Sequence, residues 1–299
     1  MLPLAIRDAA DDAPAKVNLA LHVVGQRPDG YHLIESLVTF VAGVADRVSV
    51  SQGGDADTLV VEGGFAASVP GAGNILLQAT ALARERIAGL GLTLPPLAIR
   101  LVKRLPVAAG IGGGSADAAA LLRIIVDACP AAGALIGAEA VTLGADVPMC
   151  LAGRPALVSG IGEHVEALAP LPDLPILLVN PGVAVATPAV FRALASRNNP
   201  KLPPLPPDGF RNAEELAEWL GETRNDLAAP AITIAPAIDR VTAELRAAGA
   251  LFARMSGSGA TVFGLFADRS SLRRAGLGLR AAYPSWWVSD PADTELTAA

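Results

Sequence analysis

The residues most able to do chemistry lie in the stretch 106-PVAAGIGGGSADAAALL-122. Glycine lets a backbone turn tightly and bring its N–H groups close to a ligand. Ser115 or Asp117 can cap the helix that the following alanine- and leucine-rich residues predict. Because a helix N-terminus carries free N–H groups and a partial positive charge, this stretch predicts an anion site.

The loop pattern favours the phosphates of a nucleoside triphosphate as the anion. A P-loop needs a lysine after its last glycine, but Ser115 follows Gly114 here. A dinucleotide loop follows directly on a strand, whereas residues 103–109 form a proline-containing connector. Phosphates held by loop N–H groups and a helix N-terminus fit better. A purely structural turn is the alternative.

A second reactive side chain, Lys16, lies in 13-APAKVNLALHVVGQRPDGYHLIESL-37. The alternating pattern predicts a strand with Lys16 and Asn18 on the same face. A lone lysine on a strand is more often merely solvated. The turn that follows offers an aromatic ring and an imidazole, Tyr31 and His32, which are equally compatible with ordinary turn chemistry.

Two further stretches combine small residues with polar groups. Asp146 lies in 144-GADVPMCLAG-153, where burying an unpaired carboxylate would be costly, and capping a helix is the alternative. The turn in 254-RMSGSGATVF-263 contains Ser256 and Gly257, and a simple hairpin would explain it.

Composition limits the classes of protein to consider. The 299 residues carry 23 basic and 29 acidic side chains, with no basic run, which disfavours nucleic acid as a partner. No apolar stretch reaches the length of a membrane span, and the N-terminus lacks the pattern of a secretory signal, so we expect a cytoplasmic protein. Cys129 and Cys150 are expected to be buried small hydrophobic residues.

Short strands alternate with longer helices along the chain. The sequence predicts strands at residues 36–41, 47–51, 58–62, 97–102, 176–180, 251–256 and 260–266, and helices at 74–91, 116–128, 213–220 and 238–250. This mixture predicts a mixed α/β or α+β protein rather than a helical bundle, and the length leads us to expect two domains. Residues 199–208 contain five prolines and predict a surface excursion or linker of unassigned role.

Together these stretches resemble the GHMP kinases, whose three motifs match the segments around Lys16, residues 110–119 and residues 256–259. With 145-ADVPMCLAG-153, 181-PGVAVATPAVF-191 and 225-NDL-227, the ordered motifs are most similar to the branch that phosphorylates the 2-hydroxyl of 4-diphosphocytidyl-2-C-methyl-D-erythritol in the non-mevalonate pathway to isoprenoids. The resemblance runs from about Pro14 to Phe266.

The resemblance implies a two-domain GHMP kinase fold, with domains at residues 1–155 and 156–299 and the active site in the cleft between them. It implies phosphoryl transfer from ATP, accompanied by Mg²⁺, with metal ligands left unassigned. Asp146 would accept the proton of the substrate hydroxyl. Lys16 would keep Asp146 ionised and stabilise developing negative charge.

The resemblance also implies a binding role for other residues. Those expected on the ATP side are Asn74, Lys103, Pro106, Gly110, Gly112, Gly113, Gly114 and Ser115. Those expected to bind the substrate are Asn18, Tyr31, His32, Thr187, Phe191, Ser256 and Gly257. The implied partner is this small molecule alone, without nucleic acid or membrane, and the implied protein is a monomer or weak homodimer.

Two alternatives stay open at this point. One is a GHMP kinase for a smaller alcohol such as homoserine or mevalonate, against which residues 29–32 argue. The other is a GHMP-fold protein that binds a ligand without catalysis, against which Lys16 and Asp146 argue. His22 and His164 match no motif and are expected to be packed or on the surface. Ala116 stands where the family commonly has a hydroxyl.

Overall fold

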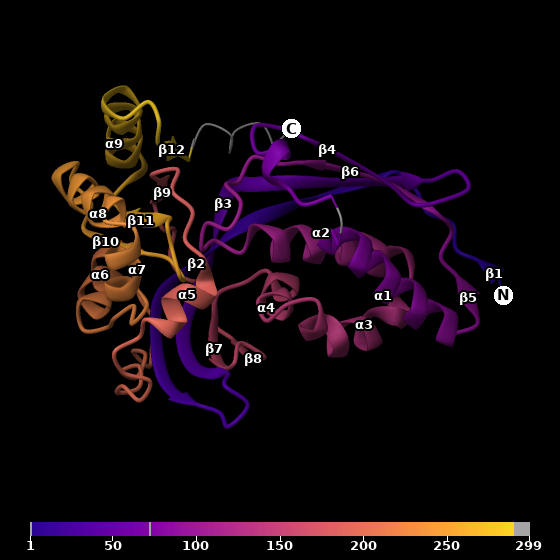
Figure 1. Cartoon of the computed structure of the whole chain (residues 1–299), viewed down its shortest axis with the longest axis horizontal. Coiled ribbons are helices and arrows are strands. Elements are labelled where there is room, and N and C mark those ends of the chain that lie inside the picture. The colour runs from indigo at the N-terminus through magenta and orange to yellow at the C-terminus, as the bar shows by residue number, and fades with distance from the viewer. Residues whose placement is uncertain (1, 72, 290–299) are drawn as a thin grey trace. The chain divides into compact units, whose positions relative to one another are not determined.

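The computed structural model describes residues 2–71 and 73–289 (Figure 1). The chain folds into two compact units, and each is assembled from separated segments. Unit 1 contains the residues up to Ala15, Ala45–Val107 and Gly112–Gly153. Unit 2 contains Lys16–Val44, Ala108–Ile111 and the chain from Arg154 onward. The mixture of helices and sheet confirms the predicted α+β class.

Unit 1 is built on a sheet in which the end of the long strand β3 (His32–Gln52) lies between its neighbours. The other strands of this sheet are the start of β2 (Ala9–Gln26), β4 (Thr58–Glu62) and β6 (Leu97–Val102), and the unit also contains β1 (Leu2–Pro3) and β5 (Leu92–Thr93). Strand β3 pairs antiparallel with β6, with Arg47 opposite Val102, and β4 pairs parallel with β6. Strands β1 and β5 form a separate parallel pair.

The helices of unit 1 pack on one another around the alanine-rich α2. They are α1 (Ile75–Gly89), α2 (Gly113–Ala128), α3 (Gly133–Glu139) and α4 (Val147–Ala152), with short 3₁₀ turns at Ala66–Ser68, Pro130–Ala132 and Ala140–Thr142. Helix α2 contacts both α1 and α4 (Figure 1). Its small buried side chains, Ala118, Ala119 and Ala120, let these helices approach closely.

Unit 2 contains the rest of β2 and β3, a hairpin beside β3, and a separate antiparallel sheet. The hairpin is β7 (Ala156–Gly160) and β8 (His164–Ala167). The second sheet has the order β10 (Phe252–Met255), β11 (Val262–Leu265), β9 (Ile176–Asn180) and β12 (Trp287–Val288). The helices are α5 (Thr187–Arg192), α6 (Ala213–Gly221), α7 (Ala228–Ile234), α8 (Ala237–Ala247) and α9 (Arg269–Ala282).

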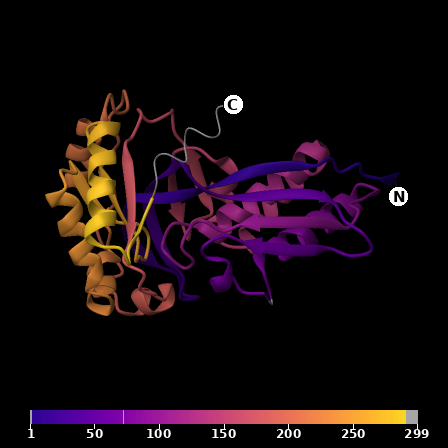
Figure 2. The same ribbon diagram turned by 90° about the horizontal axis from the view of Figure 1, so that it is seen from above.

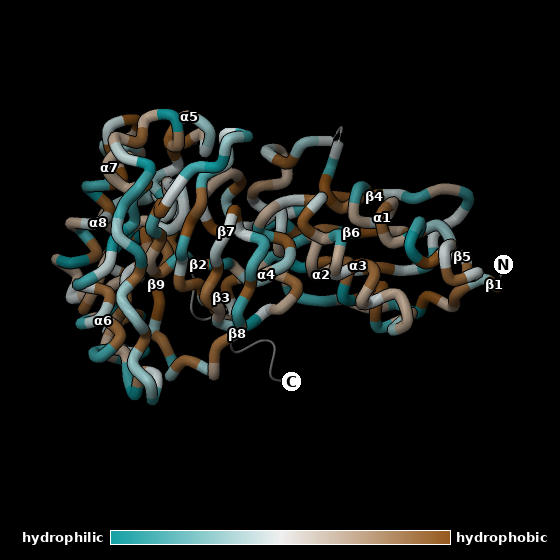
Figure 3. The backbone as a smooth tube through the Cα atoms, turned by 90° about the horizontal axis from the view of Figure 1, so that it is seen from below, coloured by the Kyte–Doolittle hydropathy of each residue, from teal (hydrophilic) through white to brown (hydrophobic). Residues whose placement is uncertain are grey.

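Helices α8 and α9 cover the second sheet of unit 2, as Figure 2 shows. All five residues of β9 are buried, as expected for a strand in the middle of a covered sheet. The amphipathic helix α8 turns Ile238, Val241 and Leu245 into this core. Hydrophobic colour in Figure 3 accordingly gathers on the strands, while hydrophilic colour is frequent along α6 and α8.

Several predicted elements are confirmed with their boundaries. Strands β4, β6 and β9 coincide with the predicted residues 58–62, 97–102 and 176–180. Asn74 caps α1 as expected, because its side chain accepts a hydrogen bond of 2.9 Å from the N–H of Leu76. Cys129 and Cys150 are both buried, as expected.

Other elements differ from the prediction in part. Residues 36–41 and 47–51 are strand as predicted but belong to one continuous strand, β3, and α5 and α9 were not predicted. Neither Ser115 nor Asp117 caps α2, because the helix begins earlier, at Gly113, with Gly112 at the N-cap position. The φ of Gly112 is +65°, a left-handed conformation that only glycine adopts readily, so the turn occurs before the serine.

Candidate active site

The ammonium of Lys16 is held by a chain of buried hydrogen bonds within unit 2. Lys16 Nζ donates to Oδ1 of Asn18 at 2.7 Å, and Asn18 Nδ2 donates to Oγ of Ser36 at 2.8 Å. Ser36 in turn donates to the carbonyl of Ala20 at 2.6 Å. Lys16 and Asn18 lie on the same strand face, as their spacing predicted, but Lys16 is only 4% exposed. The lysine is therefore oriented rather than merely solvated.

The small-residue turn after β10 lies against the same part of β2. Oγ of Ser256 accepts a hydrogen bond from the Asn18 N–H and donates to the carbonyl of Gly110, both at 3.0 Å. Asn225 Nδ2 spans the turn by donating to the carbonyls of Met255 and Gly257, both at 2.8 Å. The structure thus brings Asn18, Gly110 and Ser256 together, as expected for neighbouring parts of one site.

A partly buried arginine fixes the strand that leads into this turn. Arg254 donates to the carbonyls of Leu19, Leu220 and Thr223, and to the Thr223 hydroxyl. Burial lowers the pKa of the Arg254 guanidinium to about 10, which leaves it charged at neutral pH. Because its donors satisfy three carbonyls on two segments, β2 and the end of α6, Arg254 holds the approach to Ser256 in place.

The predicted substrate residues of α5 and of the β2–β3 turn also meet within unit 2. The His32 ring lies 4.8 Å, centroid to centroid, from the Phe191 ring, at an interplanar angle of 31°. Thr187 Oγ1 lies 2.7 Å from Oγ of Ser258, which ties α5 to the small-residue turn. Tyr31 is 60% exposed. The two rings form a wall from distant parts of the chain.

The imidazole of His32 is suited to hydrogen bonding with a polar ligand. Burial and the nearby positive charge of Arg197 lower the pKa of His32, so the ring is neutral at physiological pH. A neutral imidazole has one donor and one acceptor nitrogen. Nε2 of His32 is buried and has no hydrogen-bond partner among the described residues, so it is free to pair with a polar atom of a ligand or with water.

Unit 1 contains a buried ion cluster beside Gly113, the first residue of α2. Lys103 Nζ donates to Oδ2 of Asp46 and to Oδ2 of Asp117, both at 2.6 Å. Oδ1 of Asp46 accepts from the N–H groups of Arg104 and Leu105, immediately before Pro106. This cluster joins the connector that enters the loop to the first turns of α2.

The cluster explains why glycine stands at position 113, and it shifts the pKa values of Asp117 and Lys103. A Cβ on Gly113 would lie 3.1 Å from Lys103 Nζ, so glycine allows the ammonium to approach the backbone. Burial raises the pKa of Asp117 to about 7, although Lys103 favours its ionised form. The charges of Asp117 and Asp46 raise the pKa of Lys103 against the opposing effect of burial. The ATP contact predicted for Lys103 stays a prediction, and its ammonium binds these carboxylates.

Asp146 lies at the N-cap position of α4 in unit 1, but its side chain makes no capping hydrogen bond there. The residues just before Asp146 lie close to Ser115, in the first turn of α2. A Cβ placed on Gly144 would lie 3.8 Å from Ser115 Oγ. The structure therefore brings the glycine loop near the turn that bears Asp146. Lys16 belongs to unit 2, and its predicted pairing with Asp146 stays a prediction.

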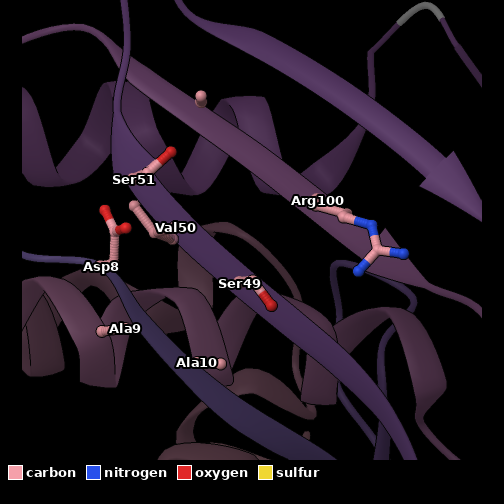
Figure 4. Close-up of a pocket in the computed structure, with 8 residues that line it drawn as sticks. Asp8, Ala9, Ala10, Ser49, Val50, Ser51 and Arg100 are labelled. Carbon is pink, nitrogen blue, oxygen red and sulfur yellow. The ribbon is translucent and has the colours of Figure 1, made fainter.

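A separate pocket of about 420 Å³ lies in unit 1, between the start of β2 and strands β3 and β6 (Figure 4). It is lined by residues that include Asp8, Ser49, Ser51 and Arg100. None of the predicted site residues lines it, so it is not part of the candidate active site. Among the described residues, no helix has the length and apolarity that a membrane span requires.

Sequence reasoning missed Ser36 and Asp46, whereas Ser258 and Asn225 lay within the motifs at residues 256–259 and 225–227 without an assigned partner. Ser36, Ser258 and Asn225 hold Asn18, Thr187 and the turn after β10, respectively, as described above. Asp46 was not singled out, because a lone aspartate in a strand pattern carries no local signal of its partner. The motif 225-NDL-227 was the one sequence feature that pointed to Asn225.

Comparison with known proteins places both units in one family. Residues 74–154 match the GHMP kinases N terminal domain, and residues 208–285 match the GHMP kinases C terminal model. A protein of Chelativorans sp. (strain BNC1) described as 4-diphosphocytidyl-2-C-methyl-D-erythritol kinase is 51% identical, over 92% of this chain and 93% of that one. A protein of Sinorhizobium medicae with the same description is 48% identical, over 92% of each chain.

Solved structures agree with these matches. A crystal structure of 4-(cytidine 5'-diphospho)-2C-methyl-D-erythritol kinase superposes with a TM-score of 0.74 at 36% identity, covering 94% of this chain and 98% of that one. A homoserine kinase from Cytophaga hutchinsonii superposes with a TM-score of 0.63 at 18% identity, covering 95% of this chain and 94% of that one. At that identity, the second likeness concerns the fold alone.

Proposed function

This chain belongs to the GHMP kinases and, within them, to the 4-diphosphocytidyl-2-C-methyl-D-erythritol kinase family, and we propose that it phosphorylates the 2-hydroxyl of that cytidylyl compound. It is an ATP-dependent kinase with an alcohol acceptor. The observation that carries the choice of substrate is the 51% identity over 92% of the chain to a relative of that description. The substrate lies on the route to isoprenoid precursors.

The catalytic step is assigned to Asp146 and Lys16. Asp146 accepts the proton of the attacking hydroxyl, which then forms a bond to the γ-phosphorus of ATP as the bond to ADP breaks. Lys16 stabilises the negative charge that develops on the transferring group. Support comes from the Asn18 amide, whose oxygen lies 2.7 Å from Lys16 Nζ and restricts where the ammonium can point.

The triphosphate is assigned to the glycine loop and the N-terminus of α2. Free N–H groups and the helix dipole favour negative charge there. Residues Gly110, Gly112, Gly113, Gly114 and Ser115 are proposed to form this cradle. Asn74, Lys103 and Pro106 are proposed to complete the ATP side, with the buried ion cluster holding the connector.

Mg²⁺ is proposed to accompany ATP. No group of three or more His, Cys, Asp or Glu side chains capable of holding a metal occurs in the described part of the chain. This fits an ion that is held mostly by phosphate oxygens and water, with few protein ligands. The hydroxyl of Ser115 and the carboxylate of Asp146 are the hard oxygen donors suited to it. When bound, the ion would neutralise charge on the phosphates.

The cytidylyl end of the substrate is assigned to the wall formed by His32 and Phe191. A pyrimidine ring can stack on an aromatic face, and its polar edge can satisfy Nε2 of His32. Tyr31, Asn18, Thr187, Ser256 and Gly257 are proposed as the remaining substrate contacts. We further propose that the enzyme acts in the cytoplasm as a monomer or weak homodimer. Its two domains are proposed to span residues 1–155 and 156–299.

The first test is a coupled ADP-release assay with ATP and Mg²⁺, offering the cytidylyl substrate, homoserine and mevalonate in parallel. Turnover with the cytidylyl substrate alone is expected. Preference for either small alcohol would leave the family assignment intact and overturn the substrate.

The role of Asp146 is tested with Asp146→Asn. We expect ATP binding to persist and turnover to fall by roughly two orders of magnitude or more, the scale of general-base catalysis. Asp127→Asn, an exposed aspartate in the last turn of α2, is the matched control and should turn over like the parent. Near-parental turnover of Asp146→Asn would remove the assigned role.

A further inference from the structure

The proline-rich residues 199–208, here called the strap, run between α5 and α6 without regular secondary structure. Such a segment has few N–H groups to pair, since proline has none. The strap is nevertheless tied to the rest of unit 2 by side chains at several points. This pattern indicates a segment held in one conformation rather than a loose linker.

The first attachment joins the strap to β2. The backbone N–H of Asn199 donates to the carbonyl of Val23 at 3.1 Å, and its Nδ2 donates to the same carbonyl at 3.0 Å. Asn199 Nδ2 also lies 3.2 Å from Oδ2 of Asp226. One residue later, the carbonyl of Pro200 accepts from Arg224 Nη2 at 2.8 Å and lies 3.0 Å from Nδ1 of His22.

The hydrogen bonds of His22 define its tautomer. Nε2 accepts a hydrogen bond of 2.9 Å from the backbone N–H of Arg224, so it carries no proton. The proton of the neutral ring is therefore on Nδ1, which donates it to the carbonyl of Pro200, the same oxygen that accepts from Arg224 Nη2. Arg224 Nη2 also lies 3.0 Å from Nδ1, but both nitrogens are donors in this arrangement, so that contact is not a hydrogen bond. Burial lowers the pKa of His22, which keeps the ring neutral. The imidazole thus links Arg224 to the strap.

The second attachment joins the strap to β3 and α6. Glu35 Oε2 accepts from the N–H of Leu202 at 3.0 Å, and Glu35 Oε1 lies 3.4 Å from Nζ of Lys201. Trp219 Nε1 donates to the carbonyl of Pro204 at 3.1 Å. The strap is therefore fixed to both strands of the β2–β3 hairpin and to the helix that follows it.

These attachments join the two elements that carry the wall assigned to the substrate, because they tie the β2–β3 hairpin to the chain that follows α5. His32 stands at the start of β3, at the turn of the hairpin, whereas Phe191 stands near the end of α5, shortly before the strap. Their rings approach to 4.8 Å although they come from segments far apart in the chain. Anchoring the strap to the hairpin shortens the free chain between Phe191 and β2 to a few residues, which restricts where α5 can move.

We propose that His22 and Asn199 are positioning residues, which hold the strap on β2 and so keep Phe191 beside His32 for binding the cytidylyl end of the substrate. This inference rests on the proposed function. Neither residue touches the reacting groups. Their loss acts on the affinity for the cytidylyl substrate and leaves the ATP side and the chemical step unchanged.

Two amide substitutions of His22 separate anchoring of the strap from local stability. The amide of Gln reaches the position of Nε2, so His22→Gln can still accept from Arg224 but cannot donate to Pro200. The amide of Asn matches Nδ1, so His22→Asn can donate to Pro200 but leaves the Arg224 N–H unpaired. Each variant loses one partly buried hydrogen bond, and only His22→Gln loses the one to the strap.

The measurement is KM for the cytidylyl substrate and for ATP, together with kcat. Loss of a hydrogen bond between neutral groups corresponds to about 2- to 13-fold. His22→Gln and Asn199→Ala should raise KM for the cytidylyl substrate within that range, with KM for ATP and kcat within about twofold of the parent. His22→Asn should keep a KM near that of the parent. Equal effects of the two His22 variants, or a parallel rise in KM for ATP, would overturn the proposal.

A second measurement does not depend on turnover. Hydrogen exchange of the backbone amides at Leu202 and in α5 should be faster in His22→Gln than in His22→Asn. Unchanged exchange of α5 in His22→Gln would overturn the positioning role even for an active enzyme. If the parent instead fails to phosphorylate the cytidylyl compound, the proposed function fails, and the exchange result still decides whether the strap positions α5.

Discussion

The ammonium of Lys103 is the group whose removal should most destabilise unit 1. Lys103 Nζ lies 2.6 Å from a carboxylate oxygen of Asp46 and 2.6 Å from one of Asp117, and the three side chains are at most 4% exposed. Deleting one member of a buried ion cluster leaves uncompensated charge in a region of low dielectric constant. We expect Lys103→Met to lower the free energy of unfolding by about 3–5 kcal/mol.

Two features of the cluster limit the loss of stability caused by Lys103→Met. Asp46 retains hydrogen bonds from the N–H groups of Arg104 and Leu105, at 2.6 and 2.8 Å. Asp117, whose pKa burial already raises to about 7, can take up a proton once the lysine is gone. The double variant Lys103→Met, Asp117→Asn should therefore recover part of the lost stability, because it leaves one carboxylate with partners.

The assay is urea unfolding followed by far-UV circular dichroism at pH 7.5. The matched control is Arg100→Met in the same unit. Arg100 forms an ion pair of the same 2.6 Å length with Glu62, but the side chains are 56% and 47% exposed, so solvent screens the pair and its loss should change the free energy of unfolding far less than the loss of Lys103. Equal losses for Lys103→Met and Arg100→Met would refute the reasoning, since burial would then not govern the energy of the pair.

Three further predictions concern charge, the glycine turn and substrate affinity. Burial raises the pKa of Asp117 in the folded protein from 3.8 to about 7, so its contribution to stability is complete below pH 3.8 and is lost as the pH rises through 7. The urea midpoint of the parent should therefore decrease when the pH is raised from 5 to 8, and it should decrease more steeply than the midpoint of Asp117→Asn. Gly110→Ala would place a Cβ 2.4 Å from the Ser256 carbonyl oxygen at a φ of +76°, so thermal unfolding should occur at a lower temperature, whereas an unchanged Tm would contradict this close approach. The double variant Tyr31→Ala, His32→Ala should raise KM for the cytidylyl substrate at least tenfold without changing KM for ATP, and full affinity would remove the argument against a smaller acceptor.

Local pattern was sufficient for many of the elements. Strand β9 reads ILLVN and is bounded by Pro181 and Gly182, and α1 follows a capping asparagine, so short-range signals determine both. Helix α9 shows the limit of such signals. It contains Gly276 and Gly278, which lower helix propensity, and it forms because Leu272, Ala275 and Leu279 pack into the core of unit 2.

The sequence by itself determined which residues are chemically suited to phosphoryl transfer: a glycine loop before a helix, a lysine and an asparagine on one strand face, and a carboxylate in an apolar run. Only the tertiary structure decided how their neighbours hold them. Lys103 meets Asp46 across 57 residues, and His22 meets Pro200 across 178. Neither pairing leaves a periodic or local mark on the chain, because hydrogen bonds and ion pairs depend on distance in space, and folding alone brings such distant residues together.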